Sequence, residues 1–323
     1  MKFSVGLQKN NSDFAEYIVK NAAHIYEVYF SWGDFPNGRS SMTDDSSLLP
    51  WELVDIQREM LSRISRSGIA LNLLFNANCY GKDSQARSFF VKVGNTVEYI
   101  KEQYGLKSIT TTSPLIAKFI KNNFDDIEVR ASVNMEIGTL QGMDYLKDYF
   151  DSFYMKRELN RDFEKIKELK NWCDENNKKL FMLANSGCLN FCSAHNFHDN
   201  LVAHEQEISA MDNAYNFGGI CREYLSNSKN YHNLIENTNF VRPEDIHRYE
   251  PYFECAKLAT RIHPHPETIL NSYINGRYSG DILRILEPMH SIYPYVLENG
   301  EELKIKKIDT DIMYMDVKTD AKQ

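Results

Sequence analysis

Residues 179–195 read Lys179-Leu-Phe-Met-Leu-Ala-Asn-Ser-Gly-Cys188-Leu-Asn-Phe-Cys192-Ser-Ala-His195, an apolar run followed directly by a polar loop. The apolar run has the length and composition of a buried strand. Two cysteines therefore follow the point where a strand ends. In a barrel of parallel strands, functional residues gather at that end of the sheet.

The same alternation of short β-rich runs and longer amphipathic runs extends along the chain. It predicts parallel strands joined by right-handed helical crossovers. Eight predicted strands favour a (β/α)8 TIM-like barrel over an open doubly wound sheet, and no Gly-x-Gly-x-x-Gly follows the first strand. The predicted strands are 3–8, 25–31, 69–76, 107–112, 127–134, 151–156, 179–184 and 254–260, and the predicted helices include 50–66, 84–104, 114–123 and 161–176.

One segment interrupts this alternation. Residues 186–250 separate the seventh and eighth strands and carry three cysteines and five of the nine histidines. Because long insertions in compact domains usually have a function, we expect this one to bear the site. We divide the chain into a barrel domain, 1–290, and a tail, 291–323, in which Asn299-Gly300 between apolar runs predicts a hairpin.

Composition excludes several classes of protein. The 323 residues are 42% hydrophobic and 25% charged, with a net charge of −8 and no basic tract, so nucleic acid is not expected as a partner. No apolar run approaches the length of a membrane span, and the N-terminus is too polar for a signal peptide. We expect a cytoplasmic protein whose cysteines stay reduced unless they bind metal.

The cysteines form the strongest candidate site. Thiolates grouped in a chain of this kind favour a metal or an iron–sulfur cluster. Cys79 follows the third strand, so it is expected on the same barrel face as the cysteines that follow the seventh. We therefore predict four ligands of a [4Fe–4S] cluster: Cys79, Cys188, Cys192 and Cys221.

Alternatives remain for this site. Cys255, which begins the eighth strand and should lie at the opposite face, and His247 compete with Cys79 as the fourth ligand. A zinc ion held by the three clustered cysteines and a histidine is a second possibility. Two buried thiols without metal are the simplest interpretation of Cys188 and Cys192. Cys173 has the pattern of a packed helical thiol.

Polar residues at the ends of the other predicted strands supply candidates for catalysis and substrate binding. Loop polarity explains part of this pattern, and Arg261 has an ion pair as its structural alternative. Residues 33–48 form a long loop, which is either a lid or a plain connection. The predicted catalytic residues are Arg157, Glu158 and Arg261, and the predicted substrate-binding residues are Asn134, Asn185, Asp34, Arg39 and His195.

Four motifs occur in a familiar order: Arg157-Glu-Leu, Cys221-Arg-x-Tyr224, Val241-Arg-Pro-Glu-Asp-Ile and Cys255-Ala-Lys-Leu-Ala-Thr-Arg261. This order resembles the collagenase-like peptidase family, U32. The resemblance implies a TIM-like barrel and, from several relatives, a [4Fe–4S] cluster on four cysteines. Cys221 matches the family pattern, whereas Cys188 and Cys192 are chosen on local chemistry.

The family contains enzymes that hydroxylate ubiquinone precursors or RNA bases without oxygen, in some of them with prephenate as the implied hydroxyl donor. We expect no further β domain of the kind found in the RNA-modifying relatives, and with the acidic charge of the chain we expect a small organic or peptide substrate. The resemblance thus implies an iron–sulfur enzyme performing an oxygen-independent redox or hydroxylation step. There are two alternatives. One is a hydrolase, as the family label states. The other is a non-catalytic iron–sulfur protein that serves a protein partner or electron donor.

Overall fold

The computed structural model describes residues 1–38, 49–231, 233–290, 295–299 and 304–307. Within this part of the chain, eight parallel strands pair in sequence order and close when β8 pairs with β1. This confirms the predicted (β/α)8 barrel, and each strand falls within or beside its predicted range. The strands are β1 (Lys2–Gly6), β2 (Ile25–Phe30), β3 (Ala70–Phe75), β4 (Ser108–Thr111), β5 (Glu128–Ala131), β6 (Ser152–Tyr154), β7 (Lys179–Leu183) and β8 (Cys255–Leu258).

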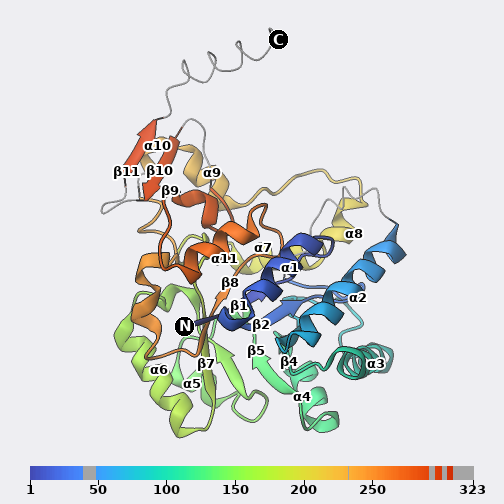
Figure 1. Ribbon diagram of the computed structural model, residues 1–323. Helices are drawn as coiled ribbons and strands as arrows, with labels where there is room; N and C mark the ends of the chain where they lie inside the picture. Colours follow the sequence, from blue (N-terminus) through green and yellow to red (C-terminus); the bar gives the residue numbers. More distant parts are fainter. Residues whose placement is uncertain (39–48, 232, 291–294, 300–303, 308–323) are drawn as a thin grey trace.

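Helices cover the outside of the barrel (Figure 1). Asp162 caps α6, because its side chain accepts a hydrogen bond from the Lys165 N–H at 3.0 Å. The barrel helices are α1 (Ser12–Lys20), α2 (Pro50–Arg66), α3 (Arg87–Tyr104), α4 (Pro114–Asn123), α5 (Leu140–Asp144), α6 (Phe163–Glu175) and α11 (Pro266–Ile274). Short 3-10 turns occur at η1 (Ala22–His24), η2 (Val133–Met135), η3 (Arg157–Leu159), η4 (Pro243–Tyr249) and η5 (Ile282–Ile285).

The segment after β7 folds as short helices instead of a strand–helix unit. It contains α7 (His195–Ala203), α8 (Glu205–Ser209), α9 (Ile220–Ser226) and α10 (Ser228–Tyr231) before η4 leads to β8. Because it leaves the carboxyl end of β7, it is placed to cover that end of the barrel.

A small antiparallel sheet follows the barrel. Its strands are β9 (Gly280–Asp281), β10 (Tyr295–Asn299) and β11 (Lys304–Lys307), with β10 in the middle. The predicted hairpin strands therefore pair, while the connection at 300–303 lies outside the described residues. Asn299 ties the sheet to the barrel, because its amide donates to Glu244 Oε1 at 2.9 Å.

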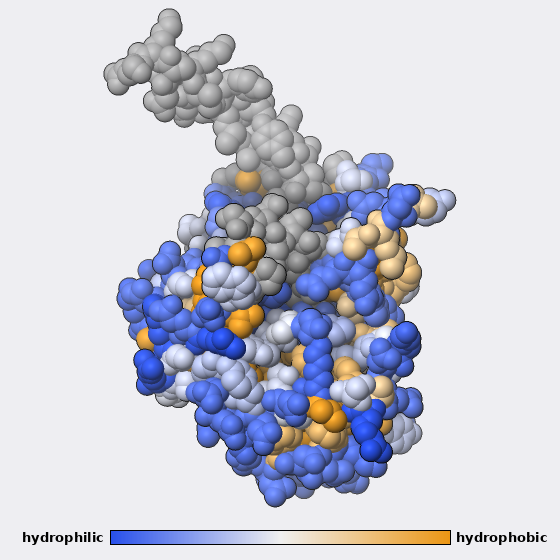
Figure 2. Space-filling view, turned by 90° about the vertical axis from the view of Figure 1, so that its right-hand side faces the viewer, coloured by the Kyte–Doolittle hydropathy of each residue, from blue (hydrophilic) through white to orange (hydrophobic). Residues whose placement is uncertain are grey.

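Apolar side chains fill two separate regions. The larger core lies between strands and helices and includes Val28, Phe30 and Ile166, all fully buried. Alternate strand residues point into the barrel, where Tyr154 and Phe181 belong to a smaller apolar group. The face drawn in Figure 2 is mostly hydrophilic, with apolar residues in small separate groups. No helix among the described residues has the length and apolarity that a membrane span requires.

The barrel interior also contains a buried ion pair. Glu27 on β2 and Arg130 on β5 are each 1% exposed, and the Arg130 Nη1 donates to Glu27 Oε1. Glu27 Oε1 accepts further bonds from Ser4 Oγ at 2.9 Å and Asn72 Nδ2 at 3.1 Å. The Arg130 guanidinium stacks 3.9 Å from the Phe181 ring centroid. Charges buried at this depth are tolerated only because they are paired and hydrogen-bonded.

The Glu27–Arg130 pair yields the first prediction. R130M should lower the free energy of unfolding by about 3–5 kcal/mol, because it leaves the Glu27 charge buried without its partner. K147M, which breaks the exposed Lys147–Asp144 pair, should cost less than about 1 kcal/mol. Urea denaturation of both variants measures the difference, and equal losses would contradict the account.

A second prediction concerns acid. Burial raises the pKa of Glu128, but the Arg130 charge and the Ser152 hydrogen bond outweigh burial and lower it to about 2. A carboxyl whose pKa is lowered by folding stabilises the fold at pH values above its pKa in the unfolded state, about 4.3. This stabilisation is lost as pH falls toward its pKa in the folded state. As pH falls from about 4.3 to about 2, the free energy of unfolding of the wild-type protein should decrease by roughly 3 kcal/mol more than that of E128Q. Parallel pH dependences in the two proteins would show that Glu128 has no such role.

Candidate functional site

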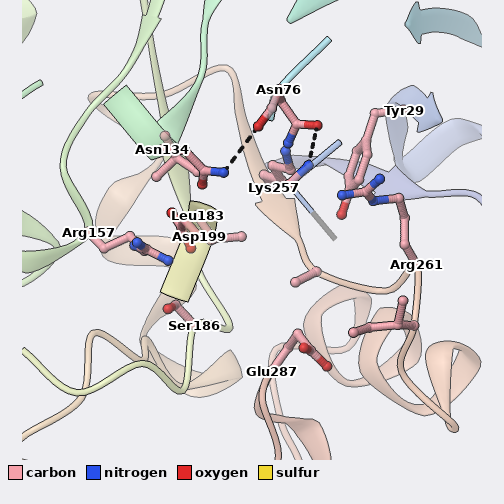
Figure 3. A pocket seen from close by; sticks show the side chains of 14 residues that line it. Tyr29, Asn76, Asn134, Arg157, Leu183, Ser186, Asp199, Lys257, Arg261 and Glu287 are labelled. Carbon is pink, nitrogen blue, oxygen red and sulfur yellow. Dashed lines mark hydrogen bonds between the residues drawn. The ribbon is translucent and has the colours of Figure 1, made fainter. Parts of the chain in front are cut away.

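A cavity opens at the carboxyl ends of the barrel strands (Figure 3). It encloses about 610 Å³, including its open mouth. Most of its polar lining comes from residues just beyond different strands, as the barrel topology requires. These polar residues are Tyr29, Asn76, Asn134, Arg157, Ser186, Asp199, Lys257, Arg261 and Glu287.

Arg261 reaches the cavity because β1 ends in glycine. A Cβ on Gly6 would lie 2.5 Å from Arg261 Cγ and 2.7 Å from the Tyr29 ring, so any side chain there would displace both. Arg261 Nη1 donates to Asn37 Oδ1 at 3.1 Å, and its guanidinium lies 5.9 Å from the Tyr29 ring centroid. The predicted Arg261 thus lies in the cavity wall.

Two amides form the opposite wall. Asn134 Nδ2 donates to the Asn76 carbonyl at 3.3 Å, and Asn76 Oδ1 accepts from the Gly38 N–H at 3.2 Å. Figure 3 shows both contacts as dashed lines. Asn134 therefore lies at the cavity, as predicted for a substrate-binding residue.

His195, the first residue of α7, joins the insertion to the cavity. Its Nδ1 lies 2.7 Å from Glu136 Oε1, and its Nε2 contacts Arg157 Nη2. Its Nε2 lies 3.4 Å from Asp199 Oδ2, which also accepts a bond from Asn78. The arrangement holds an imidazole between two carboxylates and a guanidinium beside the cavity.

Arg157 connects this group with the cysteine loop. It is 5% exposed, lines the cavity, and directs its Nη1 to Cys188 Sγ at 3.6 Å. One buried side chain therefore contacts both the cavity and a predicted ligand.

Cys188, Cys192 and Cys221 are close enough for Cys188 and Cys192 to act electrostatically on the Cys221 thiol. Burial, followed by the neighbouring Cys188 and with a contribution from Cys192, raises the pKa of the Cys221 thiol. All three are partly exposed, and each is outside any disulfide. Gly219 precedes α9 with a φ of 93°, a conformation that favours glycine. The insertion thus brings together three of the four predicted ligands.

Cys79 has different neighbours. A hydrogen bond from His204, followed by one from the Gly81 N–H at 3.4 Å, lowers the pKa of its thiol. His204 Nδ1 in turn lies 2.9 Å from Glu207 Oε2. The segment after β3 therefore meets the insertion, but through histidine instead of the other cysteines.

The rival ligands lie elsewhere. Cys255 is fully buried where β8 begins, inside the barrel, and burial raises its pKa. His247 Nδ1 contacts the Glu244 carbonyl at 2.9 Å within η4. Cys173 packs in α6, where burial raises its pKa to about 12, as expected for a core thiol. Among the described residues, no three His, Cys, Asp or Glu side chains stand in ready-made metal coordination.

Several predicted residues lie outside the cavity lining. Glu158 Oε1 accepts from the Phe191 N–H at 3.4 Å and lines a neighbouring groove. The Asn185 amide is fully buried and bonded to backbone groups, including the Ala259 N–H at 2.6 Å, so it joins β7 to β8. Asp34 pairs with Lys92 at 2.5 Å. Arg39 lies outside the described residues.

Other cavity residues were absent from the predicted site. Lys257 shares strand parity with Arg261, and that parity was the signal available for it. Glu287 follows the barrel in sequence and reaches the cavity because its backbone bridges to Ser186, a contact that no local pattern indicates. Asp199 lies in the non-periodic insertion.

Comparison with known proteins agrees with the fold. The chain matches no protein-family model. It is 24% identical over 280 residues to the uncharacterized protease MJ1657 of Methanocaldococcus jannaschii, covering 85% of this chain and 79% of that protein. The structure of the U32 peptidase Mk0906 superposes with a TM-score of 0.55 at 13% identity, covering 80% of this chain and 92% of that one. These matches support the resemblance to the collagenase-like peptidase family, U32, that the ordered motifs indicate.

Proposed function

We propose that this protein is an iron–sulfur enzyme that performs an oxygen-independent redox or hydroxylation step on a small organic or peptide substrate. The observation that carries the proposal is the grouping of Cys188, Cys192 and Cys221 beside a polar cavity, with Arg157 in contact with both. The curated relative is called a protease, and that name identifies no reaction for this chain.

The donor set fits a thiolate-held cluster in three of its positions. Neighbouring thiols that raise the pKa of Cys221 disfavour several thiolates together, and a bound cationic centre would offset that repulsion. Thiolate ligation suits both iron–sulfur clusters and zinc, and the family resemblance favours iron. As fourth ligand, Cys79 would have to exchange its His204 contact for iron.

The protein's own residues would have distinct tasks. Arg157 would hold the Cys188 side chain and fix the cysteine loop relative to the cavity. Arg261 and Asn134 would hold the substrate's polar groups, and His195, between Glu136 and Asp199, would exchange a proton with it. When bound, the cluster would supply electron transfer at the edge of this cavity.

A hydrolase is the second candidate, and one arrangement favours it. Cys79, His204 and Glu207 form a sequence of thiol, imidazole and carboxylate, the order in which a cysteine nucleophile is activated. This group does not line the mouth cavity. Cys79 thus has two mutually exclusive roles, as a fourth ligand or as a nucleophile.

The third prediction tests the cluster. Protein purified without oxygen should be brown and contain about four irons and four sulfides per chain. C188S, C192S and C221S should each lose most of the iron, whereas C173A should retain it because Cys173 packs in the core of α6. Iron and sulfide analysis provides the readout. Colourless protein with one zinc, or full iron content in the three variants, would refute the proposal.

The fourth prediction concerns Cys79. In metal-free protein at neutral pH, iodoacetamide should alkylate Cys79 faster than Cys221, because the pKa of the first thiol is lowered and that of the second is raised. H204Q should slow the reaction at Cys79, while H247Q should not change it. Equal rates at the two thiols would contradict the described contacts.

The same position separates the two functions. If C79S lowers the iron content, Cys79 acts as a ligand. If C79S keeps its iron and loses hydrolysis of a peptide substrate, the hydrolase is supported instead.

A further inference from the structure

A buried lysine lies in the floor of the mouth cavity. Lys257 is on β8, is 7% exposed and lines the cavity close to Arg261 (Figure 3). Its ammonium makes no hydrogen bond or ion pair with any residue that the structure describes. Buried lysines usually pair with a carboxylate, so this one requires another explanation.

Aromatic rings surround the amine. Lys257 Nζ lies 4.1 Å from the Tyr29 ring centroid and 5.1 Å from that of Tyr154. The face of such a ring stabilises a cation modestly and does not accept a proton from it. The Tyr29 hydroxyl is engaged by the Leu258 carbonyl at 2.7 Å and is therefore directed away from the amine.

The charges around the amine favour its neutral form. Burial, and after it the positive charge of Arg261, lower the pKa of Lys257 to about 7. The Glu27 carboxylate acts in the opposite direction, but it is already neutralised by Arg130. The groups that face this amine are Glu27 and Tyr29 from β2, Arg130 from β5, Tyr154 from β6, and Cys255 and Arg261 from β8 and its extension.

We propose that Lys257 is a nucleophile that forms an imine with a small carbonyl compound carrying an acidic group. The amine nitrogen attacks the carbonyl carbon, and the carbonyl oxygen leaves as water with the two hydrogens of the amine, so that a carbon–nitrogen double bond replaces the carbon–oxygen one. No oxidant or reductant is consumed. Arg261, whose charge acts on Lys257 most strongly, is the group that attracts the acid.

This inference is independent of the cluster. It uses the floor of the cavity and Arg261, whereas the proposed ligands lie in the insertion and in the segment after β3. Protein without metal is therefore suitable for the test.

The experiment is reductive trapping. Full-length protein at pH 7 is incubated with glyoxylate and cyanoborohydride, and peptide mass spectrometry follows the adducts at Lys257 and at the exposed Lys20 of α1. An amine with a pKa near 7 is half neutral at this pH, whereas an ordinary lysine is neutral in only about one molecule in 2,500. The hydrogen bond to Glu16 raises the pKa of Lys20, so its neutral fraction is smaller still. Lys257 should react at least about a hundredfold faster than Lys20.

Two variants and a pH series complete the design. K257M should lose the fast adduct and K20M should keep it, and the melting temperature of K257M reports whether it folds. The rate should increase as pH rises from 6 and level off near pH 8, about one unit above the pKa, because the neutral amine is the reactive form. If Lys257 reacts no faster than Lys20 in the wild-type protein, the proposal is wrong whatever the variants do.

The acidic group has its own test. Glyoxylate carries a carboxylate and acetaldehyde does not. The ratio of the glyoxylate labelling rate to the acetaldehyde labelling rate should therefore be larger at Lys257 than at Lys20. Equal preferences at the two lysines would remove Arg261 from the proposal.

Discussion

The buried pair of Glu27 and Arg130 is the constraint on which the barrel depends. A closed sheet of eight strands needs an interior filled by inward-pointing side chains, and here those side chains are largely polar. Ser4, Asn72 and Arg130 donate to one carboxylate from three different strands. A register shift in any of these strands would turn its donor outward and leave buried charge uncompensated. The network therefore specifies which residues face the interior.

The same network also determines which side chains face the mouth of the barrel. Because residues alternate along each strand, fixing Glu27 in the interior also directs Tyr29 inward, and the same parity on β8 directs Lys257 to the cavity. The insertion supplies the remaining side chains of the site. His195, Asp199 and the cysteine loop all come from residues after β7, and Arg157 joins them to the cavity from the end of β6. The site is thus half barrel and half insertion.

The strands and the main helices could be predicted because each carries a local signal. Apolar runs located the eight strands, and the amphipathic run 161–176 located α6. The equivalence of strand ends brought Arg157, Arg261 and Asn134 to one cavity. It could not show that Asn185 bonds to backbone or that His204 contacts Cys79, because both depend on side-chain directions and on an insertion without periodicity. Glu287 was missed since its contact spans about a hundred residues of sequence.

The central claim is that Cys188, Cys192 and Cys221 hold iron through sulfur beside this cavity. X-ray absorption at the iron and zinc K-edges of protein purified without oxygen tests it most directly. We predict an iron edge whose first coordination shell is dominated by sulfur, and a second shell of iron neighbours that is lost in C221S. A sample with zinc and no iron, or iron surrounded by nitrogen and oxygen alone, would contradict the account.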